Sequence, residues 1–137
     1  MIEMELNKIV IDEKRHDQLI ALKEKGGDRV LPIVIGLNEA SAIKLKISGF
    51  NPPRPLTHDL IAVIIDNLGA TVEKIIIDEL KDNTFYAKIV IKVPGGASKI
   101  IDARPSDSIA LAVRARAPIF VEDKIIKQYE MFNKEKS

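Results

Sequence analysis

Residues 71–93 read TVEKIIIDELKDNTFYAKIVIKV, and this stretch decides which kind of fold the chain adopts. Its first part has β-branched apolar residues at its centre, and its second part alternates apolar and polar residues from Phe85 to Val93. A period of two places one face of a strand against a core and the other toward solvent. The Asp82-Asn83 pair between the two parts is typical of a tight turn. The stretch therefore predicts a β-hairpin.

Five shorter apolar stretches predict further strands. They are separated by polar or glycine-containing turns such as residues 25–28 and 94–96. Pro32 lies within one stretch and has no backbone N–H to donate, so that strand is expected at a sheet edge or with a local irregularity. The five strands are expected at residues 2–11, 19–22, 30–35, 100–101 and 118–121.

Four stretches carry helical signals. Asn38 is expected to cap the first helix, because its side-chain oxygen can accept a hydrogen bond from an orphan backbone N–H. In the second helix, apolar residues recur at helical spacing from Leu60 to Leu68 and few polar residues remain. This pattern predicts a helix at the centre of the core. The helices are expected at residues 38–48, 57–69, 106–116 and 122–129.

These elements predict an α+β fold in a single domain, with a mixed or antiparallel β-sheet packed with about four helices. The domain is expected over residues 1–130, with a C-terminal tail at residues 131–137. A chain of 137 residues fits one domain, and its 46% hydrophobic content suffices for a core without disulfides or metals.

Composition excludes several kinds of chemistry. There are no cysteines, which rules out disulfides, cysteine-based zinc sites and thiol catalysis. The N-terminal residues carry no signal-peptide pattern, and no apolar run approaches the ~20 residues that span a bilayer, so a cytoplasmic protein without a membrane partner is expected. The 21 basic residues balance 20 acidic ones, so nucleic acid, if it is a partner, must bind at a local patch or transiently in a cleft.

Two similar segments, which begin at Arg54-Pro55 and at Arg104-Pro105, precede or begin helices and supply the candidate site together with Asp102. Helix N-termini attract phosphate, and arginine makes bidentate contacts with it. The expected phosphate-binding residues are Arg54, Thr57, Arg104 and Ser106. Helix capping and salt bridges would select the same residue types, so a purely structural role remains the alternative for each of them.

The same segments contain residues suited to catalysis. His58 titrates near neutrality in its unperturbed state and is the candidate for proton transfer. Carboxylates can hold Mg²⁺ or another divalent cation that activates water. The expected catalytic residues are His58, Asp59, Asp102 and Asp107, and the expected cation ligands are Asp59, Asp102 and Asp107 together with Glu39. This hypothesis requires Asp59 and Asp102 to lie close enough to share one ion.

Several motifs in order resemble the bifunctional nuclease domain family, across about residues 1–130. They are LPIVIG at residues 31–36, PPRPLTHDL at 52–60, TFYA at 84–87, DARPSDSIALA at 102–112 and APIFV at 117–121. The resemblance implies an α+β domain that forms homo-oligomers, such as a dimer, and that cleaves DNA and RNA. It carries no assigned catalytic residues onto this chain.

Three functions remain open from the sequence. The leading hypothesis is a metal-dependent nuclease that tolerates many sequences. The second is a non-catalytic regulatory domain that binds an anion, a nucleotide or a protein, which the balanced charge favours. The third is a structural oligomerisation domain, which an exposed apolar face would support.

Overall fold

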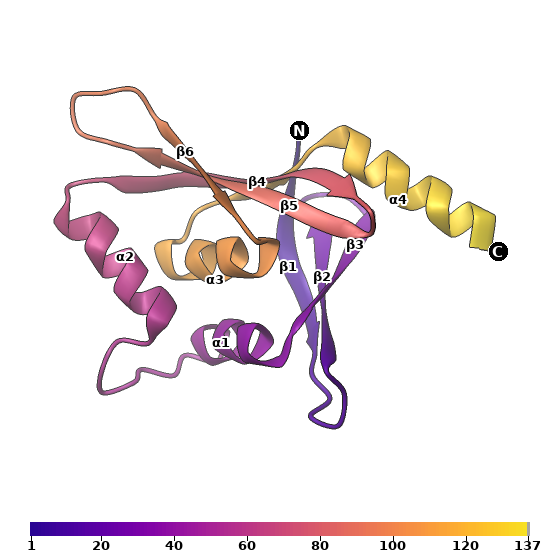
Figure 1. Ribbon diagram of the computed structural model, residues 1–137, viewed down its shortest axis with the longest axis horizontal. Coiled ribbons are helices and arrows are strands. Elements are labelled where there is room, and N and C mark those ends of the chain that lie inside the picture. Colours follow the sequence, from indigo (N-terminus) through magenta and orange to yellow (C-terminus); the bar gives the residue numbers. More distant parts are fainter. Residues whose placement is uncertain (137) are drawn as a thin grey trace.

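The computed structural model describes residues 1–136, and the side chains of residues 1–131. Seven strands form one mixed sheet, and four helices accompany it, which confirms the α+β prediction (Figure 1). The strands are β1 (Ile2–Val10), β2 (Asp17–Glu24), β3 (Val30–Gly36), β4 (Thr71–Lys81), β5 (Thr84–Lys92), β6 (Lys99–Ala103) and β7 (Ile119–Val121). The helices are α1 (Leu37–Ile47), α2 (Thr57–Asn67), α3 (Pro105–Ala115) and α4 (Asp123–Lys136).

The sheet is assembled from two antiparallel halves, and its strand order is β3-β2-β1-β7-β4-β5-β6. Strand β7 joins the halves, since it pairs antiparallel with β1 and parallel with β4. The predicted hairpin is β4 and β5, whose pairing ends at Lys81 and Thr84. Asp82 and Asn83 connect them with φ values of 53° and 62°, the left-handed backbone that a two-residue hairpin loop requires.

Strand β3 is an edge strand, as the proline within it predicts. Among the described residues β3 pairs only with β2, where Pro32 lies opposite Ala21. A residue without an N–H is tolerated there because one side of an edge strand makes no ladder bonds.

Helix α3 lies at the centre of the core. Seven of its residues are buried, and Ile109 is fully inaccessible. The core continues through apolar side chains of α1, α4 and the sheet, including Ile43, Ile75 and Ile125. In Figure 1, α3 lies between α1 and strands β4 to β6.

Helix α2 is not in the core, and the prediction that it would be central is wrong. None of its residues is buried, and Figure 1 shows it to the left of α3, at the side of the domain. Leu60 and Ile64 are each 50% exposed, and Leu68, just past the helix, is 71% exposed. Apolar spacing identified a helical face that needs cover, but it does not say which surface provides the cover.

Helix starts differ in detail from the prediction. Helix α1 begins at Leu37 with Gly36 at its N-cap, so Asn38 lies in the first turn and is not the cap. Helix α3 begins at Pro105, directly after Arg104, because proline suits the first helical position.

The last helix is longer than the sequence predicts. Helix α4 continues past Tyr129 to Lys136, and Ser137 lies outside the described residues. Of the helices in residues 1–136, none combines the length and apolarity needed to cross a membrane.

Candidate functional site

The N-terminal turns of three helices face one groove of about 710 Å³. Ile89 and Ile91 of β5 and Ile101 of β6 give it an apolar floor. Its polar wall comes from the first turns of α1 and α2 and from the start of α3, and comprises Asn38, Glu39, Thr57, His58, Arg104 and Asp107. Each helix N-terminus carries a partial positive charge, so their convergence favours a negatively charged ligand.

A histidine–carboxylate pair joins α2 to α3 in this wall. His58 Nε2 lies 2.9 Å from Asp107 Oδ1, and the imidazole is largely buried, with 12% of its side chain exposed. Burial raises the pKa of Asp107, but hydrogen bonds from His58 and Arg104 outweigh it and hold that pKa below its usual value. An ionised carboxylate only accepts hydrogen bonds, so Nε2–H of a neutral His58 is the donor and Nδ1 remains an acceptor.

Arg104 completes the polar wall. Its Nε donates to Asp107 Oδ2 at 2.9 Å, and its Nη1 lies 3.4 Å from Glu39 Oε1 of α1. These carboxylates, Asp107 foremost, raise the pKa of Arg104 further above its already high value. Two-thirds of the Arg104 side chain is exposed, and Nη2 takes part in neither pairing. We call His58, Asp107, Arg104 and Glu39 the polar cluster.

Asp59 takes a structural position beside the polar cluster. Its Oδ1 accepts a 2.7 Å hydrogen bond from Arg114 of α3, and its Oδ2 accepts the backbone N–H of Leu56 at 3.0 Å. Arg114 is 4% exposed and also donates to the carbonyl oxygens of Ala42 and Ala110. Burial raises the pKa of Asp59, but the hydrogen bonds from the Leu56 N–H and from Arg114 lower that pKa below its usual value. Asp59 therefore holds α2 against α3.

Asp102 lies on the opposite face of the sheet from the groove. It pairs in register with Lys88, whereas the adjacent pair, Ile89 with Ile101, lines the groove. Successive residues of a strand point to opposite faces. The Asp102 carboxylate lies 3.1 Å from Lys88 Nζ, and the same Nζ lies 3.5 Å from the carboxylate of Asp78.

The four carboxylates expected to share a cation do not form one donor set. Asp107 and Glu39 flank Arg104, Asp59 binds Arg114, and Asp102 lies across the sheet. In the described part of the chain, no three His, Cys, Asp or Glu side chains are grouped to hold a metal ion. These side chains therefore do not fit a shared divalent cation.

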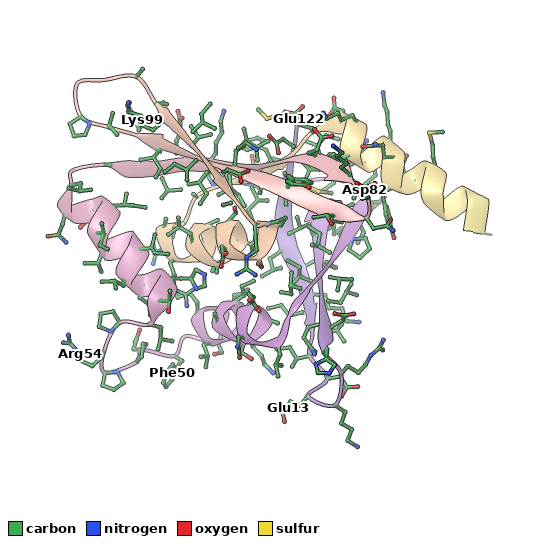
Figure 2. All side chains as sticks on the ribbon, viewed as in Figure 1. Glu13, Phe50, Arg54, Asp82, Lys99 and Glu122 are labelled. Atoms are coloured by element: carbon green, nitrogen blue, oxygen red, sulfur yellow. The ribbon has the colours of Figure 1, made fainter. Side chains whose placement is uncertain are left out.

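The expected phosphate-binding residues are divided in the same way. Thr57 and Arg104 line the groove. Ser106 is buried and lines a separate hollow beside Gly36. Arg54 is exposed on the loop before α2, and Figure 2 shows its side chain directed outward from the domain. Arg104 is the N-cap of α3, whereas Arg54 precedes the N-cap of α2 by two residues, which explains why similar segments place their arginines differently.

Sequence reasoning missed two residues of this region. Asn38 was predicted as a cap but lines the groove, and Arg114 was not singled out. A signal for Arg114 was present, because Asp107 and Arg114 are seven residues apart on α3 and so share one face. That face contacts two adjacent residues of α2, since Asp107 binds His58 and Arg114 binds Asp59.

Comparison with known proteins supports the resemblance seen in the sequence. An uncharacterized protein of Mycobacterium tuberculosis (strain ATCC 25618 / H37Rv) is 41% identical over 128 residues, which cover 93% of this chain and 76% of that relative. Bifunctional nuclease 1 of Oryza sativa subsp. japonica is 25% identical over 83% of this chain and 35% of its own length. Bifunctional nuclease 1 of Arabidopsis thaliana is 25% identical over 80% of this chain and 34% of its own length. Since the sequence model of the bifunctional nuclease domain also matches residues 19–134, this chain belongs to the bifunctional nuclease domain family.

Proposed function

We propose that this protein hydrolyses phosphodiester bonds in DNA and RNA, at the polar wall of the groove. Family membership and the names of the plant relatives support the reaction class. The chain spans about a third of those plant proteins, so their named activity comes to it only as part of this proposal.

The observation that carries the proposal is the 2.9 Å contact between His58 and Asp107. Asp107 fixes the imidazole tautomer and orientation, which leaves Nδ1 as a general base. In the proposed step, Nδ1 accepts a proton from water while the water oxygen bonds to phosphorus. The phosphorus–oxygen bond to the leaving group breaks, and that oxygen takes a proton from solvent to give a hydroxyl and a phosphate monoester. Nδ1 then releases its proton to solvent, which restores the base.

Phosphate binding in this proposal rests on Arg104 and the helix N-termini. The Nη2 donors of Arg104 are directed to a phosphate oxygen, while Asp107 and Glu39 hold the guanidinium in place. Thr57 supplies a hydroxyl from the first turn of α2. A phosphate at this wall gains the favourable end of the helix dipoles.

A non-catalytic binding function is the second candidate, and one observation favours it. Arg104 lies between the carboxylates of Asp107 and Glu39, so much of its charge is already neutralised. Such a network needs no chemistry to explain it, because it can simply join α1 to α3. A nucleotide or another small anion would then be held by the unpaired Nη2 of Arg104 and the helix N-termini rather than by a free positive charge.

The test is cleavage of end-labelled single-stranded DNA, duplex DNA and RNA by highly purified protein, with Mg²⁺, with Mn²⁺ and with EDTA. His58→Gln and Asp107→Asn are expected to lower the rate by about 10²–10⁴-fold, the usual contribution of a positioned base. Asp66→Asn is the matched control, because this exposed carboxylate lies near the other end of α2.

Circular dichroism and urea unfolding check that each variant is folded. Cleavage that survives in folded His58→Gln and Asp107→Asn would contradict the assigned site. Binding of labelled oligonucleotide without turnover, weakened by Arg104→Ala, would replace the nuclease with the binding function.

A further inference from the structure

A second hollow adjoins the groove, and Arg104 lines both of them. It has a volume of about 430 Å³ and is lined by the half-buried ring of Phe85, so we call it the Phe85 hollow. Phe85 and Ile89 of β5 are four residues apart and point to the same face of the sheet, where Ile89 belongs to the floor of the groove. A ligand bound at Arg104 can therefore extend from the groove into the Phe85 hollow.

The register of the sheet brings Phe85 to the start of α3. Ala87 of β5 pairs with Ala103 of β6, and two residues further on the antiparallel register places Phe85 level with Pro105, the first residue of α3. Strand β6 ends at Ala103, so the sheet opens at this point and the ring borders the hollow. An aromatic face at the wall of a hollow is a surface on which a flat ring can stack.

Another wall of the Phe85 hollow is the free edge of β3, which passes close to the hairpin end of β5 in Figure 1. Residues 32–36, consecutive along this strand, all line the hollow. Because successive residues of a strand point to opposite faces, a hollow that touches five in a row lies along the backbone edge. Within the described chain β3 pairs with β2 alone, so the backbone groups on this edge form no ladder hydrogen bonds. Except at Pro32, which has no N–H, they can donate to and accept from the polar edge of a ring.

The charges around the Phe85 hollow favour a neutral ligand group in it. Of the described residues that line it, Arg104 is the one basic residue, and Asp17 is acidic. A phosphate is therefore attracted to Arg104 and repelled by Asp17. Asn83 and Thr84, at the turn into β5, add uncharged donors and acceptors. A flat, neutral ring with a polar edge fits these surroundings, and a nucleobase is such a group.

We propose that the Phe85 hollow binds the base next to the scissile phosphate of a single-stranded nucleic acid. The base stacks on Phe85 and hydrogen-bonds to the edge of β3, while Arg104 holds the phosphate. A double helix keeps the faces of its bases stacked on one another, so only an unpaired or extruded base can lie against the ring. The inference rests on the proposed function, because it takes the phosphate at Arg104 to be the one that is cleaved.

The experiment compares two end-labelled single-stranded substrates of equal length and charge. One is oligothymidylate, and the other is the same sugar–phosphate chain with a stable abasic residue in place of every nucleotide. The wild type is expected to cleave oligothymidylate with the higher kcat/KM. Phe85→Leu keeps an apolar side chain but removes the aromatic face, so it should lower the ratio of kcat/KM for oligothymidylate to kcat/KM for the abasic chain by about 5- to 100-fold.

Tyr86→Leu is the matched control and should leave this ratio unchanged, since Tyr86 is the adjacent aromatic residue and points to the opposite face of β5. Equal loss on both substrates in folded Phe85→Leu would give the ring a structural role and overturn the inference. A wild type that cleaves the abasic chain as well as oligothymidylate, or duplex DNA better than either, would overturn the inference and leave the nuclease intact. Cleavage of no substrate at all would instead overturn the proposed function, and the inference with it.

Discussion

Helices α2 and α3 have eleven residues each and follow similar Arg-Pro segments, but the domain uses them in opposite ways. Helix α3 buries seven residues among the sheet and the other helices, whereas α2 buries none. Helix α3 is held by its apolar surface. Helix α2 is tied to it by two polar contacts, His58 with Asp107 and Asp59 with Arg114, and exposes an apolar stripe. Apolar content thus identifies surface that must be covered, and only the three-dimensional arrangement shows whether the same chain covers it.

The largest effect on stability is expected from breaking the ion pair between Asp59 and Arg114, which joins the two helices. Arg114→Met removes the guanidinium that binds Asp59, Ala42 and Ala110, and it leaves a partly buried carboxylate with the Leu56 N–H but without its positively charged partner. Losing one partner of a buried ion pair typically costs about 3–5 kcal/mol, and we expect a loss of that order in the free energy of unfolding. Urea unfolding measures it.

Arg54→Met is the matched control for this variant, because Arg54 is exposed and lies outside the groove. Its free energy of unfolding should change by less than about 0.5 kcal/mol. A loss below about 1 kcal/mol in Arg114→Met would mean that α2 is held mainly by apolar contacts, and the contrast between the helices would fail.

The next effect compares one substitution on the two helices. Ile109→Ala on α3 empties a fully buried position and is expected to cost about 2–5 kcal/mol. Ile64→Ala on α2 removes a half-exposed side chain and is expected to cost under about 1 kcal/mol in the monomer. Urea unfolding at low protein concentration measures both. Equal costs would show that α2 is covered within its own chain.

The sequence predicted the fold well because strands and helices have local signals. The alternation after Phe85, the Asp82-Asn83 turn and the edge strand around Pro32 were all confirmed. The position of α2 was predicted wrongly, because periodicity reports an apolar face and not its partner. The strand order could not be predicted, since β7 joins the two halves of the sheet through contacts distant in sequence.

The candidate site was predictable only in part. Similar segments indicated that two helix starts share a role, and the structure brings those starts together at His58 and Asp107. Which carboxylate lies beside which lysine or arginine depends on the register of the strands and on the helical face that each residue occupies. Asp102 pairs with Lys88 because of the register between β5 and β6, and the seven-residue spacing on α3 directs Arg114 to Asp59.

A smaller effect is the pH dependence of the stability that Asp107 contributes through its contact with His58. The pKa of Asp107 is lower in the folded protein than its usual value, despite burial, because His58 and Arg104 donate to it. A lowered folded-state pKa gives stability that is fully present above the unfolded pKa and is lost as pH falls through the folded one. The difference in unfolding free energy between wild type and Asp107→Asn should therefore hold from about pH 5 to 7 and shrink below about pH 4.

Urea unfolding at a series of pH values measures this difference. Repeating it in a His58→Gln background tests the cause, because losing the imidazole donor should reduce the stability that the charge of Asp107 contributes. A difference that grows as pH falls below 4 would have the wrong sign for an ionised Asp107, and it would remove the basis for assigning the His58 tautomer.

The smallest effect is expected at Asp102, which precedes Arg104 by two residues but lies across the sheet from the groove. Its carboxylate is 77% exposed beside Lys88, and exposed pairs contribute about 0–1 kcal/mol, so Asp102→Asn should barely change the free energy of unfolding. It should also leave cleavage near the wild-type rate while Asp107→Asn lowers that rate by about 10²–10⁴-fold, and the two variants can be assayed side by side. Equal loss of cleavage in both would mean that carboxylates on opposite faces of the sheet act together, which the described structure does not allow without a rearrangement of β6. Cleavage that is retained in Asp102→Asn and lost in Asp107→Asn would place the chemistry in the groove, where α2 contacts α3.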